Sequence, residues 1–210
     1  MIPYASRTGT RRNLSLLRLA GWRLFVSAKG VLRTEGFPYA LDNGAWTAHM
    51  RNEEFDVDAF VKAYELLGAG ADFVIAPDIV AGGHASLDLS LSWLPRLEDA
   101  RRVLIPNQDG LQPSDFSDLV SDRVGIFHGG STAWKLETMT TWGRWCAERG
   151  VYFHVGRVNT GPRFRLAHEA GAWSVDGSSA SRFAVNIPML DSLARQPDLF
   201  DVRRMLCPSA

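Results

Sequence analysis

Polar and glycine residues follow short apolar segments at seven places along the chain. They are Ser6-Arg7, Asp42-Asn43-Gly44-Ala45-Trp46, Pro77-Asp78, Asn107-Gln108-Asp109-Gly110, His128-Gly129-Gly130-Ser131, Gly156-Arg157-Val158-Asn159 and Asp176-Gly177-Ser178-Ser179. A single aspartate at such a point can simply cap a helix or form a turn. The recurrence of isolated carboxylates behind apolar segments instead favours one shared site around Asp42, Asp78 and Asp176.

Carboxylates that share a water-poor pocket can have separated pKa values, so that one acts as an acid and another as a nucleophile. This pattern suits cleavage of a glycosidic bond, because the oxocarbenium-like centre needs an anion beside it. A carboxylate metal site built from Asp42, Asp78 and Asp109 is a weaker alternative. The sequence contains no Walker-type phosphate loop, no G-x-G-x-x-G segment and no H-E-x-x-H motif, and we expect neither a metal nor a cofactor.

The neighbouring polar residues match the chemistry of a nucleotide. The amides of Asn107 and Gln108 offer both donors and acceptors, as the edge of a nucleobase requires. Backbone N–H groups at Gly129-Gly130 can donate to a ring carbonyl, and Trp46 can stack on a base. Four arginines are candidates for holding phosphates, since guanidinium groups bind them in a bidentate way: Arg7, Arg157, Arg163 and Arg182.

Alternating strands and helices must position these residues. We predict strands at residues 2–5, 23–26, 39–41, 73–76, 103–106, 124–127, 152–155 and 173–175. Helices are expected at 13–20, 56–67, 85–100 with a break at Pro95, 131–149, 161–170 and 186–194. Regular alternation predicts an α/β fold, a minimal (β/α)8 TIM-type barrel in a single domain over residues 1–210, in which ligands bind at the carboxyl ends of the strands. An open doubly wound sheet is the alternative.

Composition and charge narrow the class of protein. A chain of 210 residues can form one core without metal or disulfide staples. Its net charge of zero argues against a uniformly basic nucleic-acid-binding protein, although it permits a local basic face. The two cysteines, Cys146 and Cys207, form no zinc or disulfide pattern, which favours the cytoplasm. We see no signal peptide and no apolar segment long enough to span a membrane.

The chain resembles the tRNA-guanine transglycosylase superfamily, whose (β/α)8 barrel exchanges a base in nucleic acid through an aspartate nucleophile. The family's D-S-G-G-F segment resembles residues 40–46, so Asp42 is implied to contact the base and transfer protons. Asp78 corresponds to the family's second base-binding aspartate, and Gln108 to the glutamine after the next strand. Gly129-Gly130 resembles the family's glycine pair. The segment from His154 to Asp176 resembles the one that ends in the nucleophile, so Asp176 is implied to attack the anomeric carbon.

The chain also departs from the tRNA-modifying enzymes. It is shorter, and it lacks both the zinc site of three cysteines and a histidine and the insertions that grip tRNA. It therefore resembles the small, divergent members that are associated with phage DNA and modified bases. The resemblance implies a DNA glycosylase or a base-exchanging transglycosylase, acting on single-stranded DNA or on a base flipped from a duplex. Phage DNA modification and anti-phage defence are both possible roles.

Three other readings remain open. The first is a related transglycosylase that acts on RNA, and the second is a non-catalytic nucleic-acid-binding partner subunit. The third is an unrelated barrel enzyme that acts on a free nucleoside or sugar phosphate. The sequence predicts no oligomeric state.

Overall fold

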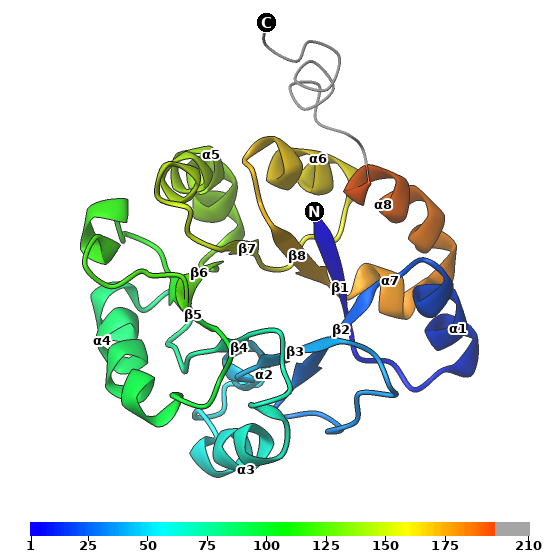
Figure 1. The fold of residues 1–210 in the computed structure, drawn as a ribbon, viewed down its shortest axis with the longest axis horizontal. Helices are drawn as coiled ribbons and strands as arrows, with labels where there is room; N and C mark the ends of the chain where they lie inside the picture. The colour runs from blue at the N-terminus through cyan, green and yellow to red at the C-terminus, as the bar shows by residue number, and fades with distance from the viewer. Residues whose placement is uncertain (196–210) are drawn as a thin grey trace, which may run out of the picture.

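The computed structural model describes residues 1–195 and has the predicted (β/α)8 architecture: a ring of parallel strands surrounded by helices (Figure 1). The barrel closes in sequence order, with β8 pairing to β1 in parallel. The strands are β1 (Ile2–Ser6), β2 (Arg23–Ser27), β3 (Tyr39–Asp42), β4 (Val74–Ile75), β5 (Val103–Asn107), β6 (Val124–His128), β7 (Phe153–Val155) and β8 (Ser174–Gly177). The open-sheet alternative is therefore wrong.

Eight α-helices connect or follow these strands within residues 1–195. They are α1 (Arg11–Leu19), α2 (Ala45–Met50), α3 (Val57–Leu67), α4 (Gly83–Trp93), α5 (Thr132–Arg149), α6 (Gly161–Glu169), α7 (Ser179–Arg182) and α8 (Ile187–Ala194). No α-helix joins β2 to β3, and β5 is joined to β6 through only a 3-10 turn, Pro113–Phe116. These two reduced units explain how the barrel fits into a chain shorter than the usual ~250 residues.

Local chemistry sets the ends of the predicted helices. Helix α5 begins after Ser131, whose side chain accepts a hydrogen bond from the backbone of Trp134, and it ends at Gly150 in the left-handed region. The expected break at Pro95 is confirmed, because α4 ends at Trp93 and a 3-10 turn contains the proline. The short helices α2 and α7 are additions that the sequence pattern did not predict.

Aromatic side chains fill the barrel interior. Tyr4, Phe25, Phe73 and Tyr152 are all buried, and the Tyr4 and Phe73 rings lie 5.2 Å apart, edge to face. We call these four residues the aromatic plug. Tyr4 and Phe25 lie in the middle of β1 and β2, and Phe73 and Tyr152 directly precede β4 and β7, so the four side chains close the barrel beneath the carboxyl ends. The carboxyl ends of the strands therefore lie above a packed floor.

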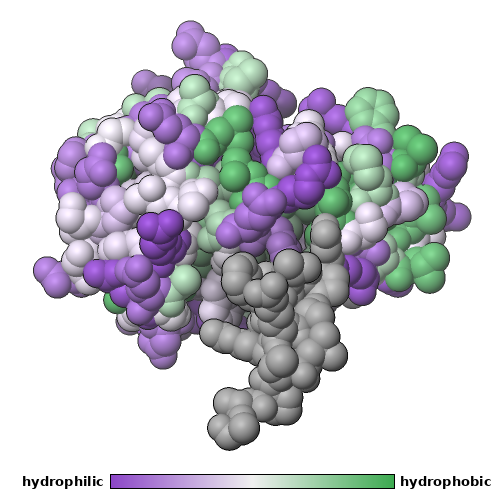
Figure 2. Space-filling model, turned by 90° about the horizontal axis from the view of Figure 1, so that it is seen from above, coloured by the Kyte–Doolittle hydropathy of each residue, from purple (hydrophilic) through white to green (hydrophobic). Residues whose placement is uncertain are grey.

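On the face shown in Figure 2 hydrophilic residues predominate, and hydrophobic residues form one group on the side of α1 and α8 and another near the middle of the view. Leu19, Val185 and Met189 are among the exposed apolar side chains on the α1 and α8 side. No helix within residues 1–195 has the length and hydrophobicity to cross a membrane. Cys146 is a buried free thiol, and Cys207 lies outside the described residues.

Candidate active site

A cavity of about 820 Å³ opens at the carboxyl ends of the strands. Its size is in the range of ~300–1,000 Å³ that is typical of small-molecule sites. Residues at the ends of all eight strands contribute to its wall. Every predicted site residue except Asn107 lines it: Arg7, Asp42, Trp46, Asp78, Gln108, Gly129, Gly130, Arg157, Arg163, Asp176 and Arg182.

Asp42 ends β3 and is half-buried at the cavity wall. Desolvation raises the pKa of this carboxyl group to about 7, and the negative charges of Asp176 and Asp78 act in the same direction. The hydroxyl group of Ser27, directly opposite Asp42 in the β2–β3 register, acts against this rise. Asp42 can therefore hold or release a proton near neutral pH, as a general acid requires.

Asp78 follows β4, and two amides hold its buried carboxylate. Asn43 Nδ2 donates to Oδ1 at 2.7 Å, and Gln108 Nε2 donates to Oδ2. Burial raises the pKa of Asp78 to about 6, although the two amide donors oppose the rise. Asn43 is itself fixed, since it also donates to the carbonyl of Ala76 and accepts from the backbone of Ala45. Asp78 thus presents a rigid acceptor to the cavity.

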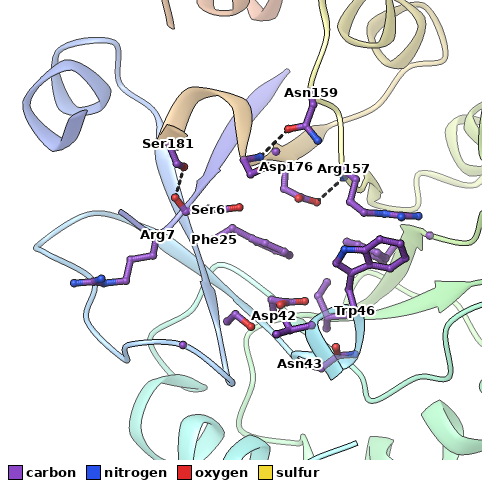
Figure 3. Close-up of a pocket in the computed structure, with 18 of the residues that line it drawn as sticks. Ser6, Arg7, Phe25, Asp42, Asn43, Trp46, Arg157, Asn159, Asp176 and Ser181 are labelled. Atoms are coloured by element: carbon purple, nitrogen blue, oxygen red, sulfur yellow. Dashed lines mark hydrogen bonds between the residues drawn. The ribbon is translucent and has the colours of Figure 1, made fainter. Parts of the chain in front are cut away.

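Asp176 lies on β8 and is almost fully buried at the cavity wall (Figure 3). Its Oδ1 accepts a hydrogen bond from the backbone N–H of Arg157 at 3.3 Å and contacts Nε2 of His154 at 3.0 Å. No hydrogen bond from a residue in the described part of the chain reaches its Oδ2. One oxygen is therefore held by the protein, and the other is available to a ligand.

Trp46 and Arg157 form a stacked pair in the cavity wall (Figure 3). The guanidinium carbon of Arg157 lies 3.8 Å from the centroid of the indole ring, in the geometry of a cation–π contact. Arg157 has a φ of 58°, in the left-handed region, and its guanidinium group donates to the carbonyl of Gly130. Trp46 remains 38% exposed, so part of its ring is available for stacking.

The four predicted phosphate-binding arginines differ in their surroundings. Arg7 forms an ion pair with Glu35 at 2.6 Å and points away from Asp42 and Asp176 in Figure 3. Arg157, Arg163 and Arg182 line the cavity and form no ion pair with any residue between 1 and 195. These three are thus the stronger candidates for contacts with phosphate.

Helix α7 follows β8, where many barrels use the N-terminus of a short helix to bind phosphate. Here the side chain of Asn159 accepts hydrogen bonds from the backbone of Ser178 and Ser179, at 2.8 Å and 3.0 Å. This amide occupies two of the backbone N–H groups at the start of α7. The arginine side chains are therefore the stronger candidates for phosphate contacts at this site.

The predicted base-reading residues are only partly free. Gln108 uses both ends of its amide within the protein, since Oε1 accepts from the backbone of Ala81 while Nε2 donates to Asp78. Gly129 N–H donates to Asn107, whereas no residue in the range 1–195 accepts a hydrogen bond from Gly130 N–H. Asn107 is fully buried behind the wall, where it supports Gly129 and does not line the cavity.

The geometry supports neither helix capping by the aspartates nor a carboxylate metal site that includes Asp109. Neither Asp42 nor Asp176 caps a helix, because α2 begins after Gly44 and α7 after Ser178. Asp109 accepts a hydrogen bond from the backbone of Ser131 and does not line the cavity. Within residues 1–195 no three His, Cys, Asp or Glu side chains are grouped to hold a metal ion.

Sequence reasoning missed three residues at this site: Ser27, Asn43 and His154. Asn43 was noted only as a neighbour of Asp42, although an Asn-Gly pair after a strand is a common signal for a polar turn. Ser27 directly follows a predicted strand and could have been found by the same rule. His154 falls within the predicted strand at residues 152–155, and only the pairing of β7 with β8 brings it beside Asp176.

In comparisons with known proteins, no family model and no curated protein matches this chain. The fold and the cavity define its class: a small (β/α)8 barrel with three aspartates around a pocket at the carboxyl ends of its strands. The resemblance to the tRNA-guanine transglycosylase superfamily stays a prediction.

Proposed function

We propose that this protein cleaves the N-glycosidic bond of a nucleobase in DNA. The observation that carries the proposal is the placement of Asp42, Asp78 and Asp176 around one cavity, with the pKa of Asp42 raised to about 7. One carboxyl group that can donate a proton beside another that can stabilise an oxocarbenium ion is the pairing that glycosidic cleavage needs.

The two catalytic aspartates have different roles in this proposal. Asp42 donates a proton to the departing base, because at neutral pH a carboxyl group with a pKa of about 7 is partly protonated. The free Oδ2 of Asp176 attacks or stabilises the anomeric carbon as the bond to the base breaks. Deprotonated Asp42 then takes a proton from water or from a second base as that molecule bonds to the anomeric carbon and any bond to Asp176 breaks. Water leaves an abasic site, and a second base completes an exchange.

The base is read in the same cavity after it leaves the DNA stack. Asp78 accepts hydrogen bonds from the base, with Asn43 and Gln108 holding its carboxylate in place. Gly130 N–H donates to a ring carbonyl, and Trp46 stacks on the base or on its neighbour. These groups make a polar pocket with one aromatic wall.

The DNA backbone is held by arginines at the same opening. Arg157, Arg163 and Arg182 have no carboxylate partner among residues 1–195, so their charge is available to phosphates. This local basic group accounts for DNA binding by a chain whose net charge is zero. We place the reaction in the cytoplasm, where it would serve phage DNA modification or anti-phage defence.

The test uses phage genomic DNA that carries hypermodified bases, with unmodified DNA as control. Each DNA is incubated with the protein, released small molecules are identified by mass spectrometry, and abasic sites are counted. We expect wild-type protein to release a base and Asp176→Asn to release none while remaining folded. Asp109→Asn is the matched control, because Asp109 follows β5 but lies outside the cavity wall, and it should keep full activity.

Each other outcome points to a different function. Abasic sites identify hydrolysis, whereas incorporation of a supplied free base without abasic sites identifies exchange. Release from tRNA but not from DNA would overturn the proposed substrate. A protein that releases no base, and binds DNA equally well with both Asp42 and Asp176 changed to Asn, is a binding subunit. Equal binding of a mononucleoside and long DNA, without salt dependence, would indicate a free-nucleoside enzyme.

A further inference from the structure

A chain of hydrogen bonds runs from the barrel interior to Asp176. Nε2 of His154, on β7, lies 3.0 Å from Oδ1 of Asp176, and its Nδ1 lies 2.7 Å from the hydroxyl oxygen of Ser174 on β8. That hydroxyl oxygen accepts a hydrogen bond from Tyr152 at 2.9 Å. His154 and Ser174 are fully buried, and Tyr152 belongs to the aromatic plug. We call Tyr152, Ser174 and His154 the relay.

The chemistry of these groups determines which atom donates and which accepts in each hydrogen bond of the relay, and we call this order its direction. Burial lowers the pKa of His154, so the ring is neutral and carries one N–H. A carboxylate oxygen can only accept, so the proton lies on Nε2 and points at Asp176. Nδ1 then accepts from the hydroxyl group of Ser174, which in turn accepts from Tyr152. Every donor in this order has an acceptor.

If every hydrogen bond of the relay ran in the opposite direction, one donor would lack an acceptor. If Nδ1 carried the proton, Ser174 would donate to Tyr152, and the phenol hydrogen would have no acceptor among residues 1–195. Nε2 would face the carboxylate as a second acceptor, so Asp176 would have to hold a proton of its own. A buried hydroxyl group without a partner is unfavourable, so the first direction is preferred.

Aromatic rings hold the imidazole in this orientation. Phe25 and Phe127 lie nearly parallel to it, with interplanar angles of 14° and 16° and centroid distances of 5.8 Å and 5.2 Å. Phe73 packs against it at a steeper angle, with centroids 5.0 Å apart. These contacts fix the plane of His154, and therefore the direction in which Nε2–H points.

We propose that His154 is a positioning residue for Asp176, held in its Nε2–H tautomer by Ser174 and Tyr152. The relay keeps Oδ1 of Asp176 engaged and presents Oδ2 to the cavity. This inference rests on the proposed function of Asp176 as the group that meets the anomeric carbon. A misplacement of about 1 Å in such a group can lower turnover by about 100-fold.

The first test measures the tautomer without any substrate. Long-range ¹H–¹⁵N spectra of the full-length protein, with the His154 signal assigned by its loss in His154→Gln, report which ring nitrogen is protonated. We expect the proton on Nε2 in wild-type protein, and a changed Nδ1 shift in Ser174→Ala because its donor is gone. A proton on Nδ1, or on both nitrogens, would overturn the relay.

The second test measures turnover with the DNA that the wild-type protein cleaves. His154→Leu removes the donor and should lower kcat about 100-fold with little change in KM, whereas His154→Gln keeps an N–H near the position of Nε2 and should recover activity to within about tenfold. His168→Gln is the control outside the site: His168 lies in the last turn of α6 and does not line the cavity, and its variant should keep wild-type kcat.

The two tests separate failure of the relay from failure of the proposed function. Equal kcat for His154→Leu and wild-type protein would remove His154 from the mechanism while leaving Asp176 in it. An inactive wild-type protein would remove the proposed function, and the tautomer would still decide whether the relay has the inferred direction.

Discussion

Replacing Asp42 by asparagine is expected to make the protein more stable at alkaline pH while abolishing its activity. The folded protein keeps a proton on Asp42 up to about pH 7, whereas the unfolded chain releases it near pH 4. The free energy of unfolding therefore falls as the pH rises from about 4 to about 7, because in this range unfolding releases the proton and a higher pH favours the state that has lost it. Asparagine is neutral throughout and removes this penalty.

The magnitude follows from the difference between the two pKa values. Raising the pKa of an aspartate from its ordinary value to about 7 corresponds to about 4 kcal/mol in favour of the neutral form. Asp42 is only half-buried, so solvent screening reduces this figure, and we take about 2 kcal/mol. Asp42→Asn should thus exceed wild-type stability by about 2 kcal/mol at pH 8, and the difference should shrink towards zero as the pH approaches 4.

Urea unfolding followed by tryptophan fluorescence measures this difference at several pH values. Asp78→Asn is the contrasting variant, because Asp78 accepts hydrogen bonds from two amides and an asparagine would set its own NH₂ group against one of them. The free energy of unfolding of Asp78→Asn should be lower than that of the wild-type protein by about 1–3 kcal/mol. Equal stability of Asp42→Asn and wild-type protein at pH 8, or a difference that does not vary with pH, would refute the desolvation of Asp42.

Three further results are expected. Base release should fall about tenfold for each pH unit above about 7, because Asp42 must hold a proton to act as the acid, and a flat pH–kcat profile would exclude that role. Trp46→Ala should raise the Kd for single-stranded DNA at least about fivefold in fluorescence anisotropy, whereas Trp173→Ala, exposed where β8 begins, should not. Gly143→Ala should lower the free energy of unfolding, measured in urea, by about 3 kcal/mol, since its Cβ would lie 1.9 Å from the carbonyl oxygen of Ala170. Arg144→Ala, the neighbouring control, should leave this free energy nearly unchanged.

The order and type of the long elements could be predicted from the sequence. Apolar runs such as residues 103–106 form strands because a barrel strand is buried on both faces, and β5 is buried at all of its positions. The positions of Asp42, Asp78 and Asp176 followed from the same rule, since each residue lies at or just after the end of a predicted strand. The closed ring then brought these separate positions to one cavity.

The side-chain contacts of the site could not be predicted, because they depend on the register of neighbouring strands and on partners that are distant in the sequence. The contact between His154 and Asp176 requires the β7–β8 register, which no local pattern encodes. The ion pair that engages Arg7 needs Glu35, a residue in a loop with a φ of 50°. Asn107 looked equivalent to Gln108, yet successive strand residues point to opposite faces, and only Gln108 reaches the cavity.

The aromatic plug gives the cavity a closed floor, so anything that enters must leave by the same opening. On the proposed function, a flipped nucleotide enters with its base first, and the base lies between the plug and its own sugar. After cleavage the base is trapped until the DNA withdraws. The free base is then the last product to leave, and it competes with the next DNA for the empty protein. Turnover in such a barrel slows as its own product accumulates.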